Sequence, residues 1–488
     1  MAVVTNLNDS GPGSLRQAII DTNASAVDNT ITFDPGLVGV INLTSGPLPT
    51  ITDNLAILGP GANVVAVNGT EMFQVFSVGG GVVVSISGLT VEMGSAGFGG
   101  GVFNQGSLTL LQMVIRRNQA TANGGGIDNR GNLIIEDSTV TENVATNAGG
   151  GLSSITSVTI RRSTLLTNRA LIGGGMAVVA GTALVVDSTF SGNVASNSNG
   201  GGIANQGTLE LQRTTIDNNS AANDGGGVSS VIGVLAVTNS TLSGNTAGNV
   251  GGGILIQATA EVSFTTIANN AATAAGGAIA AIAANFTVKN SIAALSTNGA
   301  GGPQADCFVA GGTFVPLGTN FSTQGGCPGF TVVTPAQLNL GPLALNPPGS
   351  TETHALLPGS VAIDAAPDCT DVNGAPVPTD QRGVLRPQGP ACDVGSFEVE
   401  VVPPTTTTTS TTSTTSTTST TSTTSTTSTT STTSTTSTTS TTSTTSTTST
   451  TSTTTTSTTT TSTTTTLTTT TPPPRGASWP GLVTEVSQ

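Results

Sequence analysis

Residues 124–146 read GGGIDNRGNLIIEDSTVTENVAT, and this stretch decides the fold. It holds three short apolar runs, at Ile127, at 133–135 and at Val140. Each run is bounded by Gly, Asn, Asp, Ser or Thr, which are turn-forming residues. No apolar pattern keeps the 3.6-residue period of a helix, whereas short runs with a period of two recur. The stretch therefore predicts three short strands joined by turns.

Three features of this stretch recur in phase every 24–27 residues. Gly-Gly-Gly triplets begin at Gly99, Gly124, Gly149, Gly173, Gly200, Gly225 and Gly251, and a degenerate Gly276-Gly277-Ala278 follows. Asparagines keep the same interval at Asn118, Asn143, Asn168, Asn193, Asn219, Asn245 and Asn270. Ser/Thr pairs begin at Ser138, Ser163, Ser188, Thr214, Ser240 and Thr265. Three features in phase are typical of a repeat architecture.

A repeat of this length with three strands and no helix predicts an all-β fold, a single-stranded right-handed parallel β-helix with about 25 residues per coil. A propeller blade needs about 40 residues, and a leucine-rich repeat has its own leucine and asparagine pattern. In a parallel β-helix each strand pairs with its equivalent about 4.8 Å above and below. The in-phase asparagines should therefore form an internal ladder of hydrogen bonds, and the glycines should mark a tight corner.

The position before each Ser/Thr pair carries alternating charge. It holds Gln112, Asp137, Arg162, Asp187, Arg213 and Asn239 in successive repeats, and Glu136 faces Arg161 beside them. Because these side chains recur one coil apart, we expect a surface salt-bridge ladder that helps to hold the coils in register. A functional alternative is an acidic–basic strip that binds sugar or metal.

The composition divides the chain into five parts. Residues 1–76 are predicted to form an N-terminal cap with irregular first coils, including a short capping helix after Ser14 in which Leu15, Ala18 and Ile19 share an apolar face. Residues 77–300 hold the regular repeats, and 301–400 form a C-terminal cap. The Thr/Ser-rich, Pro-bracketed stretch at 401–474 is predicted to be a disordered stalk. Residues 475–488 have no predicted role.

The four cysteines lie in the predicted C-terminal cap. They allow three pairings, and we favour Cys307–Cys327 and Cys369–Cys392 because each closes a local loop. Their spacing does not suit a zinc site. Disulfides indicate an oxidising compartment, so an extracellular or cell-surface location is expected. The sequence starts within a predicted strand without the regions of a signal peptide, so we interpret it as a mature form, a mis-assigned start or a fragment.

Charge and composition restrict the partners. The net charge is −14, with 12 Lys and Arg residues, and this argues against nucleic acid, which needs a basic surface. No apolar run is long enough to span a membrane, and no cofactor motif is present. The expected partner is a polysaccharide or another surface ligand, and the protein is expected to be a monomeric rod.

Two segments resemble modules of bacterial surface proteins. The repeats, with Gly-Gly before an apolar residue and the box Phe190-Ser191-Gly192-Asn193, resemble those of polymorphic outer-membrane proteins, as does the opening stretch 8–19. Residues 362–365, Cys369, the Thr-Asp-Gln-Arg-Gly motif at 379–383, Arg386-Pro387, the Cys-Asp-Val-Gly motif at 392–395 and Phe397-Glu398 resemble a choice-of-anchor Q domain. The resemblance implies an exported, adhesin-like β-helix protein without a shared catalytic activity.

Parallel β-helices also include pectate lyases and polygalacturonases, so an enzyme is the alternative. A retaining or inverting hydrolase needs two carboxylates about 5–9.5 Å apart. Asp137 and Asp187 lie two repeats apart with Arg162 between them, and His354 is interpreted as an ordinary loop histidine. No catalytic residue is therefore predicted; Asp128 or Asp137 would be the first to test. Asp364, Asp380 and Asp393 are weak calcium candidates, beside the simpler interpretation of an arginine–carboxylate network.

The sequence thus favours a non-enzymatic, exported β-helix protein on a Thr/Ser stalk, adhesin-like or binding carbohydrate or matrix. The alternatives are a polysaccharide lyase or glycoside hydrolase, and a structural surface-layer component.

Overall fold

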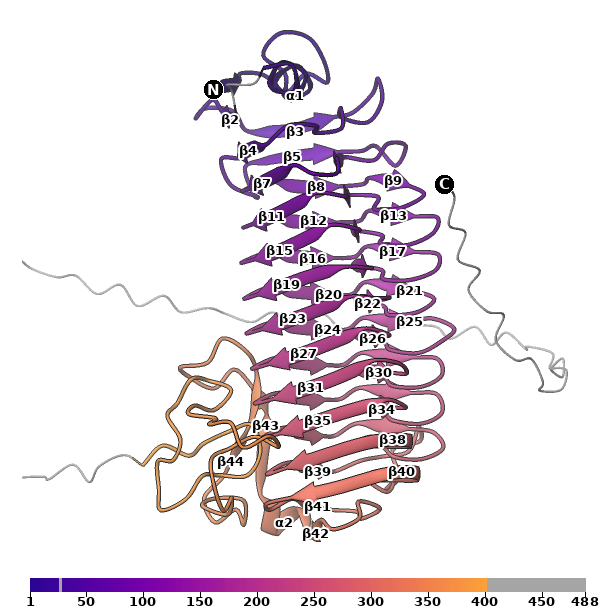
Figure 1. The fold of residues 1–488 in the computed structure, drawn as a ribbon, viewed down its shortest axis with the longest axis vertical. Coiled ribbons are helices and arrows are strands. Elements are labelled where there is room, and N and C mark those ends of the chain that lie inside the picture. Colours follow the sequence, from indigo (N-terminus) through magenta and orange to yellow (C-terminus); the bar gives the residue numbers. More distant parts are fainter. Residues whose placement is uncertain (26–28, 402–488) are drawn as a thin grey trace, which may run out of the picture. The chain divides into compact units, whose positions relative to one another are not determined.

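The computed structural model describes residues 1–25 and 29–401. Apart from its first residue, the predicted stalk lies outside the described residues, as does the segment 475–488. Within the described part the chain is a parallel β-helix, and one of its sheets runs through thirteen strands (Figure 1). Equivalent strands of neighbouring coils pair in parallel about 25 residues apart, for example Ile127 with Leu152. The predicted fold class is confirmed.

A regular coil has four strand segments rather than the three expected. One coil consists of β14 (Ile127–Asn129), β15 (Asn132–Glu136), β16 (Thr139–Thr141) and β17 (Val144–Ala145). The first two belong to one sheet, so the coil still has three faces. The fourth segment was missed because two residues are too short to give an alternating apolar pattern.

The strands form three parallel sheets that run along the coils, which we call sheets A, B and C. Sheet A has 21 strands, sheet B 13 and sheet C 8. One row of sheet A consists of three-residue strands that pair in succession, β6 (Phe76–Val78), β10 (Val102–Asn104), β14, β18 (Leu152–Ser154), β22 (Met176–Val178), β26 (Ile203–Asn205), β30 (Val228–Ser230) and β34 (Ile254–Ile256). The other strands of sheet A are β1 (Ala2–Val4), β2 (Thr30–Phe33), β4 (Leu55–Leu58), β7 (Val83–Ser87), β11 (Ser107–Leu111), β15, β19 (Ser157–Arg161), β23 (Thr182–Val186), β27 (Thr208–Gln212), β31 (Val234–Thr238), β35 (Thr259–Ser263), β38 (Ile279–Lys289) and β40 (Cys307–Leu317).

Sheets B and C hold the shorter strands. Sheet B consists of β3 (Gly39–Asn42), β5 (Val65–Asn68), β8 (Thr90–Glu92), β12 (Val114–Arg116), β16, β20 (Thr164–Leu166), β24 (Thr189–Ser191), β28 (Thr215–Asp217), β32 (Thr241–Ser243), β36 (Thr266–Ala268), β39 (Ile292–Ala294), β41 (Phe321–Ser322) and β42 (Thr331–Val332). Sheet C consists of β9 (Ser95–Ala96), β13 (Gln119–Ala120), β17, β21 (Arg169–Ala170), β25 (Val194–Ala195), β29 (Ser220–Ala221), β33 (Thr246–Ala247) and β37 (Ala271–Ala272).

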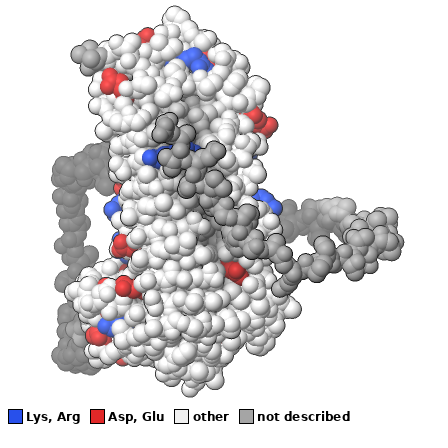
Figure 2. Space-filling model, turned by 45° about the vertical axis from the view of Figure 1, so that its right-hand side comes forward, with Lys and Arg blue, Asp and Glu red and all other residues white. Residues whose placement is uncertain are grey.

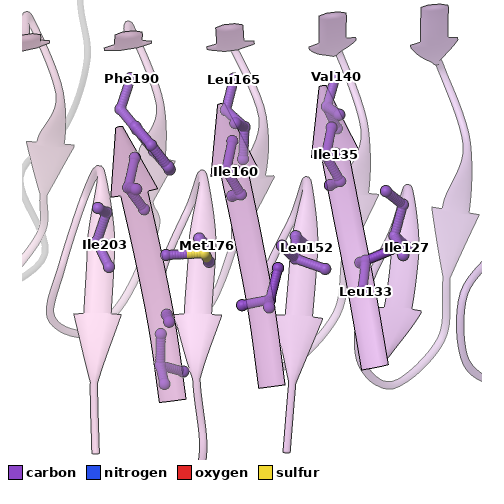
Figure 3. Close-up of a cluster of buried hydrophobic side chains, with 14 of the residues drawn as sticks. Ile127, Leu133, Ile135, Val140, Leu152, Ile160, Leu165, Met176, Phe190 and Ile203 are labelled. Carbon is purple, nitrogen blue, oxygen red and sulfur yellow. The ribbon is translucent and has the colours of Figure 1, made fainter. Parts of the chain in front are cut away.

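The core is one continuous apolar column between the sheets. Equivalent residues stack on one another, as Figure 3 shows for the row Ile127, Leu152, Met176 and Ile203 and for the row Val140, Leu165 and Phe190. These side chains are fully buried. Because each coil contributes the same few apolar positions, the column grows coil by coil, as expected for a solenoid.

A short helix covers the N-terminal end of the column. Helix α1 (Leu15–Asn23) packs on β1 and β2 with Leu15, Ala18 and Ile19 buried. The Ser14 hydroxyl accepts a hydrogen bond from the Gln17 N–H, as an N-cap does. The Gln17 side chain donates to Asp21 instead of returning to the cap, so the reciprocal half of a capping box is absent from this helix.

The C-terminal end of the column is closed by the chain around β40, β41 and β42. The disulfide Cys307–Cys327 lies here, and both its cysteines and Phe330 belong to the column core. Phe314 of β40 packs edge-on against Phe286 of the preceding coil. The first disulfide thus fixes the end of the column.

Residues 335–401, which we call the lateral module, lie along the side of the coils (Figure 1, orange). They contain α2 (Pro335–Leu338) and the antiparallel pair β43 (Leu340–Ala344) and β44 (Thr353–Leu356). The disulfide Cys369–Cys392 lies in the module. Its own apolar cluster packs against Phe264, Ile292 and Phe321 of the coils. Of the predicted C-terminal cap, only the first part closes the column, and the rest covers one face.

Candidate functional site

The seven in-phase asparagines form one buried ladder. Asn143 donates its backbone N–H and its Nδ2 to the Oδ1 of Asn168, at 3.0 Å each, and also donates Nδ2 to the Ile115 carbonyl. The pattern repeats from Asn118 to Asn245, and Asn270 ends it. All seven side chains are fully buried. The ladder satisfies polar groups at a turn inside the column and offers no surface to a ligand.

The glycine triplets make room for this ladder. Gly124, the first glycine of its triplet, has φ +65°, a conformation that favours glycine. A Cβ on Gly126 would lie 3.0 Å from the Asn143 Cγ and 2.6 Å from the Gly151 carbonyl oxygen. The two sequence features are therefore in phase because one fits against the other.

A second internal ladder was missed by the sequence analysis. In the pairs that begin with serine, the first hydroxyl is buried and accepts from a backbone N–H of the preceding coil, for example Ser163 Oγ from the Ser138 N–H at 3.0 Å. The Ser163 hydroxyl donates in turn to the Arg161 carbonyl. The in-phase Ser/Thr pairs were the signal for this ladder.

The row of alternating charges forms separate ion pairs. Arg162 contacts both Asp137, at 2.7 Å, and Glu136, and Arg213 contacts Asp187 at 2.7 Å. Glu136 is level with Arg161 in the sheet, yet its side chain pairs with Arg162. In each coil the residue of this row has a positive φ, so the backbone turns in the same way at each of these positions. The described contacts include no ion pair between Arg162 and Asp187, so the row is not a continuous ladder.

The charged residues of the lateral module form a buried network. Arg386 pairs with Glu398 at 2.8 Å, Arg382 pairs with Asp380 at 2.8 Å, and all four are nearly inaccessible. Each guanidinium also lies over a ring, Arg382 over Phe397 at 3.7 Å and Arg386 over Phe264 at 4.5 Å.

The three calcium candidates take part in this network. The Asp380 carboxylate accepts backbone N–H groups of Arg382, Val384 and Glu398. Asp393 accepts from the N–H of Asp364 and of Val399. In residues 1–25 and 29–401, no group of three or more His, Cys, Asp or Glu side chains is arranged to hold a metal ion. These carboxylates shape the module's backbone.

The interpretation of His354 as a loop histidine is wrong. It lies on β44 with 1% exposure, between the module and the coils. Its Nδ1–H donates to the Gly341 carbonyl at 2.8 Å, and its Nε2 accepts from the Ser243 hydroxyl at 2.9 Å. Burial lowers the pKa of His354, and the hydrogen bond to Gly341 opposes this only in part. Lys289 also joins the two parts, through Asp368 at 2.8 Å.

Sheet B is the face that the module leaves partly uncovered. The outward residues of β28, β32 and β36 are buried, and Thr215, Thr241 and Thr266 bond to the module. Those of β16, β20 and β24 are half-buried, and they include Thr139, Thr164 and Thr189. The uncovered part of sheet B thus presents a row of hydroxyls.

The uncovered part of sheet B is hollowed at its N-terminal end. A hollow of about 490 Å³, which we call the sheet B hollow, is lined by strands of four successive coils, β3, β5, β8 and β12. Val40, Ala66 and Val114 give it apolar walls. The single ion pair in it joins Arg116 to Glu92 at 2.7 Å. Its volume lies within the range of small-molecule sites, about 300–1,000 Å³.

A second hollow lies at the glycine corner of the early coils. About 280 Å³ in volume, it is lined by Gln74, Ala96, Gly97, Phe98 and Phe103, and we call it the phenylalanine hollow. Its neighbour Arg130 lies over both rings, 4.3 Å from the centre of Phe98 and 5.1 Å from that of Phe103. The Arg130 Nε–H donates to Asp128 at 2.8 Å. Burial raises the pKa of Asp128, and Arg130 opposes this shift.

These surfaces offer little for acid–base catalysis. On the strands of sheet B the acids are Glu92 and Asp217, which lie five coils apart, about 24 Å at 4.8 Å per coil. A carboxylate pair for glycoside hydrolysis needs about 5–9.5 Å. Asp128 and Asp137, the residues first considered for an enzyme, are each paired with an arginine.

The fold places this protein in the class of parallel β-helix proteins. No protein-family model and no curated protein matches the sequence. Among solved structures, the crystal structure of pectate lyase Pel9A is similar, with a TM-score of 0.42 and 14% sequence identity over 81% of this chain and 96% of that one. Among the helices of the described part of the chain, none has the length and hydropathy needed to cross a membrane.

Proposed function

We propose that this is an exported, non-catalytic, adhesin-like protein that binds carbohydrate or matrix through the uncovered part of sheet B. The observation that carries the proposal is this face itself. It joins a hollow of about 490 Å³ to a row of hydroxyls, and the two acids on its strands, Glu92 and Asp217, lie too far apart for a catalytic pair. Hydroxyls along a flat face suit an extended polar ligand, which has hydroxyl groups of its own.

Three further features support the proposal. Among the atoms of Figure 2 that are not grey, charged side chains are few and scattered, so a neutral polymer meets little desolvation cost on that part of the surface. The two disulfides are consistent with an exported protein. The sequence resemblance to polymorphic outer-membrane protein repeats and to a choice-of-anchor Q domain implies surface display.

The test uses the full chain with its disulfides intact. The protein is incubated with immobilised neutral and acidic polysaccharides, and both retention and new reducing ends are measured over a day. The proposal expects retention without turnover. Steady product release would make the protein a lyase or hydrolase, and self-association without retention would make it a structural component.

A pair of variants locates the binding. Ala66→Trp fills the sheet B hollow, and Ala236→Trp adds the same side chain to a half-buried outward position of sheet A. Ala66→Trp should weaken retention at least about tenfold, whereas Ala236→Trp should leave it unchanged. Equal retention by the two variants would remove the sheet B hollow from the site.

A further inference from the structure

The phenylalanine hollow combines features that neither the column nor the sheet B hollow shares. Phe98 is 40% exposed, in a chain whose other phenylalanines on the coils are mostly buried. The ring borders an open space of about 280 Å³, close to the lower limit of small-molecule sites. Phe98 and Phe103 line the same hollow, so the exposed ring is part of a small apolar wall and not an isolated surface residue.

The polar groups beside the rings are held in place. Asp128 has 3% exposure and fixes Arg130 through its Nε–H, while the two rings hold the guanidinium plane. Within residues 1–25 and 29–401, the terminal nitrogens of Arg130 have no hydrogen-bond partner. Gln74 is fixed by donating to the carbonyls of Phe98 and Gly99. The hollow itself is therefore walled by the two rings and by Gln74, and Arg130 lies beside it, over the rings, with its terminal N–H groups available.

We propose that the phenylalanine hollow binds one pyranose ring of a neutral carbohydrate. The C–H face of the sugar packs on Phe98, and neighbouring hydroxyls accept from the terminal N–H groups of Arg130. The charge of Arg130 is matched by Asp128, so the site has no excess positive charge for an acidic sugar. The net charge of −14 also repels polyanions. The volume suits a single ring rather than a long segment of polymer.

The phenylalanine hollow lies on a different part of the coil from the sheet B hollow and shares no lining residue with it. Apart from Gln74, which precedes β6, the residues of the phenylalanine hollow come from the chain around β9 and β10, between sheets C and A. The sheet B hollow is lined by β3, β5, β8 and β12. Failure of one site therefore leaves the other in place.

The experiment titrates the full chain with neutral gluco-, xylo-, manno- and chito-oligosaccharides and with oligouronates, by calorimetry. Phe98→Ala removes the exposed ring, and Phe308→Ala removes a ring of similar exposure, 37%, at the other end of the coils. Gly97→Val fills the hollow without a clash, because a Cβ there meets no atom within 4 Å. Circular dichroism checks that each variant is folded.

We expect one neutral oligosaccharide to bind, and its Kd to rise about tenfold or more in Phe98→Ala and Gly97→Val. Phe308→Ala and Ala66→Trp should leave this Kd unchanged, and Phe98→Trp should keep the binding and report it by fluorescence. Binding of oligouronates only, or of no member of the panel, would overturn the proposal. Loss of binding in Ala66→Trp but not in Gly97→Val would place the ligand in the sheet B hollow instead.

Discussion

At the scale of single residues, stability depends on polar side chains that are buried with their partners. Asn193 accepts from the backbone N–H and Nδ2 of Asn168 and donates to Asn219 and to the Leu165 carbonyl. Its removal leaves several buried groups unsatisfied at once, and each such group costs free energy.

Replacement of one ladder asparagine tests this reasoning. Asn193→Ala should lower the free energy of unfolding by about 1–3 kcal/mol or more, because donors and acceptors in two neighbouring coils lose their partner. Asn147→Ala is the matched control, since Asn147 lies exposed and donates its amide to Asn123 on the surface. Urea unfolding measures both. A similar small loss in the two variants would contradict a structural role for the ladder.

His354 predicts a pH dependence of stability with a defined sign. Burial lowers its pKa in the folded state below the ordinary value of 6.5, so the unfolded chain binds the proton more readily. The histidine's contribution to stability is complete above pH 6.5 and is lost as the pH falls towards its folded-state pKa.

The thermal midpoint between pH 7 and about pH 5 measures this loss. His354 is the only histidine of the chain, so no second imidazole titrates in this range. His354→Gln should be less stable at pH 7 and should show a flatter pH profile over the same range. Parallel profiles for the wild type and the variant would show that another group is responsible.

At the scale of elements, the corner of each coil depends on two residue types that fit together. The third glycine of a triplet lies against an asparagine amide of the same coil and a backbone carbonyl of the next coil. Ala at this position keeps the backbone angles accessible yet introduces overlap with main-chain atoms, which cannot move away as a flexible side chain does.

Gly126→Ala should therefore lower the free energy of unfolding by about 1–3 kcal/mol. Gly80→Ala serves as the control, because a Cβ there first meets an atom at 4.0 Å. Thermal and urea unfolding compare the two variants with the wild type. Equal stability of Gly126→Ala and Gly80→Ala would show that the corner has more room than these distances indicate.

At the scale of the whole described molecule, two disulfides act on two different parts. Cys307–Cys327 closes the column, and Cys369–Cys392 holds the lateral module that covers β28, β32 and β36. The module is bound to this face largely through polar groups such as Gln381, which bonds to both Thr215 and Thr241.

Cys369→Ser with Cys392→Ser should loosen the module and leave the coils folded. Loss of a disulfide costs about 2–5 kcal/mol, and here the cost falls on the module alone. Hydrogen exchange should speed up in residues 335–401 and in β28, β32 and β36, while β16 and β20, which the module does not cover, should keep their protection. Uniform loss of protection along the coils would contradict this division.

The sequence by itself determined the repeating part of this protein. The coil length, the stacked asparagines and the pairing of the cysteines follow from residues that recur in phase or lie close together in the chain. Each strand pairs with its equivalent one coil away, so a feature such as Asn118 or Gly124 needs to be understood only once and then repeats.

Only the tertiary structure decided the contacts that do not repeat. Ser243 and His354 are 111 residues apart, and no pattern in the sequence places the module on sheet B instead of across the column end. Glu136 forms its ion pair with Arg162, and Phe98 lies beside Arg130. Both contacts depend on backbone angles and on side-chain packing at one coil. Such contacts arise once, between particular surfaces, so periodicity carries no information about them.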